Sequence, residues 1–416
     1  MNRPAFKNSE LGPIPADWEV KRLGEICDDC GYGIGAEAVP FDGTNKYIRI
    51  TDIDERSHRF KPSPLCSPSF VLEDRVVGRG DILVARTSAS VGKSYIYDET
   101  DGHLLFAGFL MRVHVAKAEP RFVFYTTTTP QFAQWVLQES ARSGQPGLNL
   151  AQLRTFCLAI PPLTEQRRIA AALSDADAWI ESLDKLIEKK KLVKQGAMQA
   201  LLSGKTRLPG FSGKWGEKRL GEIGEFRKGA GISREEGRSG IIPAVRYGEL
   251  YTHHDCIIRA FGSHISEAIA RRATLLKPGD ILFACSGETK EEIGKCAAFI
   301  QPVRAYAGGD LLIMTPNPAL CDSTFMGYAL NSAECQAQKS ASGQGDAVVH
   351  LHKDALEELE IRLPPTLAEQ TAIAAVLSDM DAELAALSRE KAKAEQIKQG
   401  MMQELLTGRT RLAEGE

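Results

Sequence analysis

Two short motifs combine residue types that could do chemistry on nucleotides or DNA. Gly92-Lys93-Ser94 follows an apolar strand pattern, as in a phosphate-binding loop, where backbone N–H groups and a lysine hold the phosphates. Such a loop needs a glycine five residues before its last glycine, and Thr87 occupies that position. Asp280, Glu288 and Lys290 have the spacing of metal-dependent nucleases, in which two carboxylates hold the metal ion and the lysine polarises the phosphate. Asp280 also follows a glycine, as turn residues do, which favours a structural role for it. A stand-alone nuclease that uses these three residues stays an alternative.

Other motifs could bind a metal ion or a flipped base, and each is incomplete. His253-His254-Asp255-Cys256 offers metal donors, although a polar loop is the simpler interpretation. Cys27 and Cys30 form a CxxC pair, but no second such pair and no histidine pair completes a zinc site, which indicates reduced thiols. Residues 160–163 (Ile-Pro-Pro-Leu) and 363–366 (Leu-Pro-Pro-Thr) lack the polar and aromatic residues with which a base methyltransferase grips its target. These motifs do not support a stand-alone methyltransferase, which stays a second alternative.

A set of basic, aromatic, amide and glycine residues points to DNA instead. Arginine can hold guanine with two hydrogen bonds, glutamine and asparagine can hold adenine, and glycine-rich turns can offer N–H groups to phosphate. The net charge of −3 excludes a uniformly basic surface but allows a local basic groove. The candidate DNA-binding residues are Tyr32, Gly33, Arg49, Arg86, Lys93, Arg142, Gln145, Asn149, Arg227, Lys228, Arg246, Tyr247, Lys290, Lys295, Gln344 and His350.

The elements that position these residues come from an internal repeat. Residues 18–26 return at 215–223, and about half of the positions in 169–208 return in 373–412, so the chain holds two copies of one unit of about 200 residues. Several candidates recur at matched positions, pairing Arg49 with Arg246, Lys93 with Lys295, and Asn149 with His350. Each copy has a divergent front part, here called a head, and a nearly duplicated tail. The tails should therefore do one thing twice, whereas the heads should differ.

The tails have the pattern of long helices. Ile169, Leu173 and Ala176 begin a series of apolar residues at alternating steps of four and three, and the second tail repeats it, which is the seam of a coiled coil. About 40 residues at ~1.5 Å each give ~60 Å. We expect the two helices to pair antiparallel into a rod with a head at each end. Gly196 and Gly400, inside the helices, suggest close backbone packing.

The heads have the pattern of mixed α/β domains, so the predicted fold class is α+β with an internal pseudo-two-fold repeat. Residues 46–53, 81–85 and 280–284 are predicted strands, and 122–137 and 325–338 are predicted helices. The predicted organisation is head one at 1–160, helix one at 161–204, a linker at 205–214, head two at 215–363 and helix two at 364–408. No secretory signal and no run of about 18 apolar residues is visible, so we expect a cytoplasmic protein away from membranes.

The chain resembles the specificity subunit of type I restriction–modification systems. The resemblance rests on Pro-Pro with Glu-Gln and Ile-Ala at 161–170, Leu-Leu-Ser-Gly-Lys at 201–205, and their second copies at 364–374 and 405–409. The opening Trp-x-x-x-x-Leu-Gly-Glu-Ile and the Gly-Asp-Ile-Leu strand of both heads also match, so the resemblance covers essentially the whole chain.

The resemblance implies two target recognition domains, each of which reads one half of a split, asymmetric site in double-stranded DNA. It implies that the helices set the gap and bind two modification subunits, which carry the S-adenosylmethionine site, while restriction subunits bring ATP and magnesium. The chain itself would hold no cofactor and catalyse nothing. The residues assigned to partner binding are Glu165, Gln166, Ile169, Glu369, Gln370 and Ile373. A coiled-coil scaffold with no role on DNA is the remaining alternative.

Overall fold

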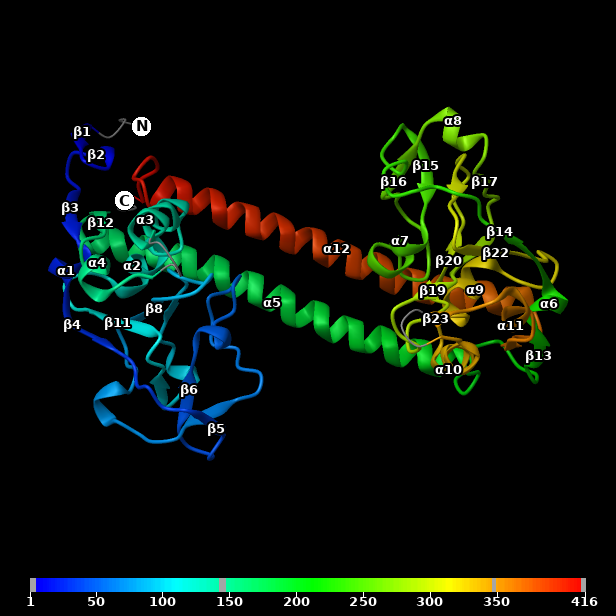
Figure 1. Cartoon of the computed structure of the whole chain (residues 1–416), viewed down its shortest axis with the longest axis horizontal. Coiled ribbons are helices and arrows are strands. Elements are labelled where there is room, and N and C mark those ends of the chain that lie inside the picture. The colour runs from blue at the N-terminus through cyan, green and yellow to red at the C-terminus, as the bar shows by residue number, and fades with distance from the viewer. Residues whose placement is uncertain (1–4, 142–146, 346–348, 413–416) are drawn as a thin grey trace. The chain divides into compact units, whose positions relative to one another are not determined.

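The computed structural model describes residues 5–141, 147–345 and 349–412. It divides into two compact units, one of residues 1–184 with 389–416 and the other of residues 185–388. Each unit contains one head and parts of both long helices, α5 (Leu163–Leu202) and α12 (Leu367–Leu405) (Figure 1). The division therefore does not follow the sequence repeat, because the helix of each copy contributes its far end to the unit of the other copy.

An antiparallel sheet of four strands, in the order β4-β11-β8-β9, forms the centre of the first head. Its strands are β4 (Cys27–Tyr32), β8 (Asp81–Ala85), β9 (Ser94–Ile96) and β11 (Leu110–Val115). The prediction of a strand at 81–85 is confirmed. All of its residues are buried because successive side chains point to opposite faces, so Ile82 and Val84 join one apolar cluster while Leu83 and Ala85 join another.

The second head contains the same sheet in the order β14-β22-β18-β20. Its strands are β14 (Gly224–Lys228), β18 (Asp280–Ala284), β20 (Cys296–Phe299) and β22 (Leu311–Pro316). The strand predicted at 280–284 is confirmed, and its alternate residues again divide between two apolar clusters. The mixed α/β heads and the α+β class are confirmed by these sheets and the helices that cover them.

The helical segments predicted at 122–137 and 325–338 are each broken into two helices, so the prediction of single helices was wrong. The first head has α2 (Pro120–Thr126) and α3 (Pro130–Ser140), and the second has α9 (Ser323–Ala329) and α10 (Ala333–Ser342). Thr129 and Ser332 cap the second helix of each pair, and each accepts a hydrogen bond from the backbone N–H of the third residue of that helix. Pro130 adds a second reason, because proline is tolerated at a helix start but not in its interior.

The strand predicted at 46–53 is also shorter than expected. It ends as β6 (Lys46–Ile48), and the chain turns at Arg49 into the 3-10 helix η1 (Ile50–Asp52). In the second head, β15 (Ile242–Val245) passes through Arg246 into α7 (Tyr247–Thr252). Both candidate arginines therefore stand at a junction between a strand and a helix.

Shorter elements complete the two heads. In the first they are β1 (Phe6–Ser9), β2 (Gly12–Pro15), β3 (Glu19–Arg22), α1 (Leu23–Ile26), β5 (Ala38–Pro40), β7 (Cys66–Pro68), η2 (Glu73–Arg75), η3 (Glu99–Asp101), β10 (Leu104–Phe106), α4 (Leu150–Leu153) and β12 (Cys157–Ile160). In the second they are β13 (Gly216–Arg219), α6 (Leu220–Ile223), β16 (Ser263–Ile265), α8 (Glu267–Ala270), β17 (Thr274–Leu275), β19 (Ser286–Gly287), β21 (Tyr306–Ala307), β23 (Val349–His350), α11 (Lys353–Glu357) and β24 (Glu360–Leu363).

The long helices pair antiparallel, as predicted. In the first unit, Lys391 and Lys398 of α12 lie 2.5 Å from Asp184 and Asp177 of α5, respectively. Positions in α12 therefore rise as those in α5 fall. In the second unit, Lys190 and Lys194 of α5 lie 2.6 Å from Glu383 and Asp381 of α12, respectively.

The two glycines inside the long helices do not serve close packing. A Cβ atom added at Gly196 or Gly400 would have no atom within 4 Å. Both residues are exposed, so the prediction of tight backbone contact at these glycines was wrong. Among the described residues, no helix has the length and apolar character needed to span a membrane.

Candidate nucleic-acid interface

In the first head, several candidate residues meet where four loops converge. Backbone hydrogen bonds join these loops, from Ala107 N to Ile48 O at 3.0 Å, from Gly108 N to Ile34 O at 2.7 Å, and from Arg86 N to Phe109 O at 3.0 Å. Each of these loops follows or precedes a strand of the head. The rigid sheets therefore hold Gly33, Arg49 and Arg86 in one place, although the sequence separates them widely.

The same loops converge in the second head. Gly308 N donates to Val245 O and Gly229 N donates to Leu311 O, both at 2.9 Å, while Cys285 N donates to Asp310 O at 3.1 Å. The equivalence of Arg49 with Arg246 is thus visible in the structure as well as in the sequence. By the same matching, Cys285 stands where the first head has Arg86, and Asp310 stands where it has Phe109.

Glycine is required at the centre of both loop clusters. A Cβ atom at Gly33 would collide with the carbonyl oxygen of Ala107, and one at Gly229 would collide with that of Gly308. These glycines let two loops approach each other more closely than any side chain would allow. The glycine-rich turns noted in the sequence therefore serve loop packing, and contact of their N–H groups with phosphate stays a prediction.

An aromatic–arginine pair distinguishes the first head. The guanidinium carbon of Arg86 lies 4.6 Å from the centre of the Tyr32 ring, and the Tyr32 hydroxyl accepts a hydrogen bond from Leu150 N at 3.0 Å. Nε of Arg86 is buried and has no hydrogen-bond partner among the described residues. Beside this pair, 64% of Phe109 is exposed. The second head replaces this set with Cys285, Lys228 and Asp310, so the two clusters differ in charge and shape.

Arg49 and Arg246 share an unusual environment. Arg49 donates from Nε and Nη2 to the carboxylate of Asp52, each at 2.8 Å, and Arg246 donates from Nε to Glu249 at 3.3 Å. Both acids are buried, whereas the side chains of both arginines are 30% exposed. The hydrogen bonds to Asp52 raise the pKa of Arg49 above its ordinary value. Each arginine is therefore held in place by a buried acid, while part of its side chain stays exposed to solvent.

The comparisons with known proteins agree with this duplicated architecture. The family model described as "Type I restriction modification DNA specificity domain" matches residues 15–191 and again 212–399. The chain belongs to this family. It is 24% identical to the putative type I restriction enzyme MjaX specificity subunit of Methanocaldococcus jannaschii, covering 98% of this chain and 97% of that protein. It is 22% identical to the MjaVIII specificity subunit of the same organism, with 98% and 96% covered.

Solved structures of the specificity family have the same fold. The S subunit of the type I system from M. genitalium matches with a TM-score of 0.61 at 15% identity, covering 97% of this chain and 99% of that one. A chain from a study of complex assembly and conformational transition of the type I R-M system matches with a TM-score of 0.57 at 19% identity, covering 95% and 99%. The resemblance seen in the sequence motifs is confirmed.

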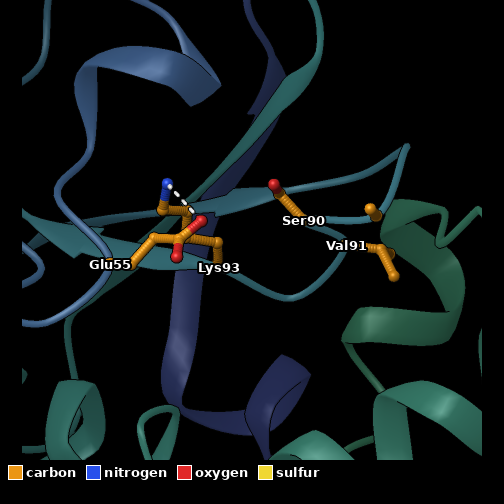
Figure 2. A pocket seen from close by; sticks show the side chains of 5 residues that line it. Glu55, Ser90, Val91 and Lys93 are labelled. Atoms are coloured by element: carbon orange, nitrogen blue, oxygen red, sulfur yellow. Dashed lines mark ion pairs between the residues drawn. The ribbon is translucent and has the colours of Figure 1, made fainter. Parts of the chain in front are cut away.

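Lys93 has a largely internal role in this member of the specificity family. Its ammonium donates to Ile50 O at 3.3 Å and lies 3.9 Å from Glu55, and its side chain is 12% exposed. Figure 2 shows Lys93 and Glu55 facing each other at a shallow pocket whose other side carries Ser90 and Val91. Lys93 therefore ties its loop to η1, which leaves little of it for DNA. Its counterpart Lys295 is half-buried, whereas Lys290 is exposed.

Arg227 is engaged inside the second head. Its guanidinium pairs with the buried carboxylate of Asp280 and donates to Thr315 and to Leu275 O. Asp280 begins β18, and the loop cluster lies beyond its other end, so Arg227 does not join the cluster, and its contact with DNA stays a prediction. Asp280 also accepts from Lys277 N at 2.7 Å. Its oxygen atoms are thus occupied by protein donors, and the suggested nuclease triad does not form.

The matching of Asn149 with His350 was wrong. Asn149 caps α4 by accepting from Gln152 N at 2.9 Å, and the residue in the same place before α11 is His352. Leu148 N donates to Arg86 O and Leu351 N donates to Cys285 O, which places the two segments in register. The error arose because the loop before these segments differs in length between the heads.

The remaining candidates are divided. His350 and Gln344 exchange backbone hydrogen bonds of 3.0 and 2.8 Å, so these two residues do lie together. Tyr247 follows Arg246 directly, and its side chain is 40% exposed. Arg142 and Gln145 lie outside the described residues. Contacts of all these residues with DNA stay predictions.

The six residues assigned to partner binding are buried and hold the fold together. Glu165 accepts from Arg411 at 2.6 Å and Glu369 accepts from Arg207 at 2.5 Å, while Gln166 and Gln370 each accept a backbone N–H of a head at 2.8 Å. Ile169 and Ile373 are buried in the main apolar clusters. These residues therefore have an internal role in the single chain, which covers them, and their contact with a partner stays a prediction. Arg207 and Arg411, three residues after the helix-ending glycines of each copy, went unnoticed in the sequence, although they recur at matched positions.

A second duplicated cluster fastens each helix pair to its head. The hydroxyl of Tyr125 donates to Asp177 at 2.8 Å, and that of Tyr328 donates to Asp381 at 2.6 Å. Burial lowers the pKa of Lys194, but hydrogen bonds to Asp255 and Asp381 outweigh this effect and raise its pKa above the ordinary value. In each unit, the lysine, tyrosine and aspartate therefore form a partly buried polar cluster that connects the helix pair to the head.

Proposed function

We propose that this chain selects the DNA sequence for a type I restriction–modification complex, with each head reading one half of a split site. The observation that carries the proposal is the pair Arg49 and Arg246. Each stands at the same junction of the same loops in its own head, partly exposed and held by a buried acid. Arginine is the side chain that most often reads guanine in the major groove. Two such sites on two similar sheets suit two separate half-sites.

The two half-sites should differ in sequence. Around Arg49 the first head presents Tyr32, Arg86 and the exposed Phe109, whereas the second presents Lys228, Cys285 and Asp310 at the corresponding positions. An aromatic ring can contact the methyl group of thymine, and a carboxylate can accept from cytosine. Because these side chains are unlike, the proposed target is asymmetric.

We also propose that the chain acts as an adaptor and not as an enzyme. In this proposal two modification subunits bring S-adenosylmethionine, and restriction subunits, where present, bring ATP and magnesium. Exposed apolar residues on the long helices, including Leu192, Val193 and Ile397, offer a docking surface that the buried motif residues do not. The nearly identical tails suit two copies of the same partner.

Mapping of adenine methylation tests this function. The genome of the source organism is sequenced for methylated adenine with the gene intact, deleted and restored. We expect one split, asymmetric motif to disappear on deletion and to return on restoration. An unchanged methylation pattern would contradict the role in sequence selection, and a symmetric motif would contradict the assignment of unlike half-sites to unlike heads.

The alternatives predict other outcomes. A stand-alone nuclease or methyltransferase would act on DNA as the pure chain, with magnesium or with labelled S-adenosylmethionine, respectively. A coiled-coil scaffold would leave methylation unchanged and would show no sequence preference in a binding selection from random duplexes.

A further inference from the structure

Each of the two arginines, Arg49 and Arg246, forms an ion pair with an acidic residue three positions later in the sequence. Asp52 accepts three hydrogen bonds of 2.8 Å from Arg49, from its backbone N, its Nε and its Nη2. Glu249 accepts from Arg246 Nε at 3.3 Å, and Ser263 bridges the pair by accepting from the same Nε at 2.8 Å and donating to the carboxylate. The side chains of the two acids are 2% and 4% exposed.

These acids are difficult to explain by stability alone. A buried carboxylate gives up its hydration, and pairing with a half-exposed arginine recovers only part of that loss. In the second head the arrangement is incomplete, since Oε2 of Glu249 and Nε2 of His254 are buried without a hydrogen-bond partner in the described structure and lie 3.8 Å apart. Both heads nevertheless keep the acid at the same position, although the surrounding residues diverge. The shared feature is therefore the orientation of the arginine.

Both acids hold the arginine from the side and leave its end free. Asp52 accepts one N–H from Nε and one from Nη2 of Arg49, so both N–H groups of Nη1 and the second N–H of Nη2 have no partner in the described part of the chain. Glu249 and Ser263 accept only from Nε of Arg246, so both of its terminal nitrogens are without a partner there. In both arginines the parallel N–H donors of Nη1 and Nη2 match the N7 and O6 acceptors of guanine.

We propose that Asp52 and Glu249 are positioning residues that set sequence discrimination, each by presenting the Nη1 and Nη2 donors of its arginine in a fixed direction for guanine. This inference rests on the proposed function. A flexible arginine would keep its charge and its attraction for phosphate, but it would lose the preorganisation that distinguishes one base pair from another. Removing the acid should therefore relax specificity at one position of one half-site.

The test compares Asp52→Asn and Glu249→Gln in a strain whose own gene is deleted. Both changes keep the size of the side chain and remove the negative charge. For Glu249→Gln we expect the ratio of methylation rates, preferred base against the other bases at one position of one half-site, to fall about tenfold, which corresponds to ~1.4 kcal/mol. For Asp52→Asn we expect a fall of about the same size, roughly tenfold, at one position of the other half-site, since Asp52 orients the same pair of donors in Arg49. Each variant serves as the control for the other, because its unaltered half-site reports an intact complex.

Two further variants keep the test decisive if a substituted acid prevents folding. Arg49→Lys and Arg246→Lys retain the charge at a half-exposed position but cannot make the same grip, since lysine has no Nε–H and no planar fork. They should relax the same positions as the acid variants of the same head. The inference is overturned if all four variants keep the wild-type motif and rates, or if one substitution alters both half-sites. If the wild-type gene itself produces no split motif, the proposed function fails instead.

Discussion

Lys194 of α5 lies 2.6 Å from Asp381 of α12, and the same ion pair recurs in the other unit between Lys398 and Asp177 at 2.5 Å. The lysine of each copy thus meets the aspartate of the other copy. The two copies follow each other in the sequence, but in the structure each copy supplies one residue to the ion pair in each unit. Because of this exchange, each tail must fit the other.

We predict that Lys194→Ala destabilises the second unit. The side chains of Lys194 and Asp381 are 9% and 13% exposed, so the substitution leaves a partly buried carboxylate without its main partner. The expected cost is about 3 kcal/mol of unfolding free energy. Urea denaturation measures it, and Lys191→Ala is the control, because that lysine is exposed and should change stability by less than about 0.5 kcal/mol. Equal effects of the two substitutions would contradict the role of the buried pair.

We predict that Arg49→Ala and Arg246→Ala weaken recognition of different half-sites. Loss of one base contact costs about 1–3 kcal/mol, or roughly 5- to 150-fold. Binding is measured with duplexes that carry either half-site intact and the other one scrambled. Loss of the same half-site in both variants would show that the heads do not divide the target, and no loss in either would remove these arginines from the interface.

We predict that lengthening both long helices by one heptad widens the unread gap. Seven residues add ~10.5 Å, or about three base pairs at ~3.4 Å each, and preserve the apolar seam. The insertions belong after Leu186 in α5 and after Ser388 in α12, between the ion-paired positions of the two units. Methylation mapping should find both half-sequences unchanged and the gap enlarged. An insertion in one helix alone should abolish methylation, because it shifts the lysine–aspartate pairs out of register.

We predict that Cys30 is more reactive than Cys157 near neutral pH. A hydrogen bond from Cys27 lowers the pKa of Cys30, whereas burial raises the pKa of Cys157. Because the thiolate is the reactive form, a lower pKa gives more thiolate below pH 9. Alkylation by iodoacetamide at pH 7, followed by mass spectrometry, should modify Cys30 first. The preference should fall in Cys27→Ala, and an unchanged order there would exclude the neighbouring thiol as the cause.

Local patterns in the chain were enough to predict much of the architecture. The strands at 81–85 and 280–284, the two long helices and their antiparallel pairing were confirmed, because apolar spacing depends directly on the period of a strand or a helix. The repeat and the family motifs likewise led to the specificity family. These features depend on residues that are neighbours in the sequence or that recur in it.

Features that depend on contacts across the fold could be known only from the tertiary structure. Glu165 and Gln166 look like an exposed motif at a helix start, yet Arg411 and the first head cover them. The three-residue spacing of Arg49 and Asp52 is visible in the sequence. The burial of Asp52, which holds Arg49 in one orientation, depends on the tertiary structure. Spacing determines which residues are neighbours along a helix or strand. The desolvation and hydrogen-bond geometry of these residues depend on which remote parts of the chain cover them.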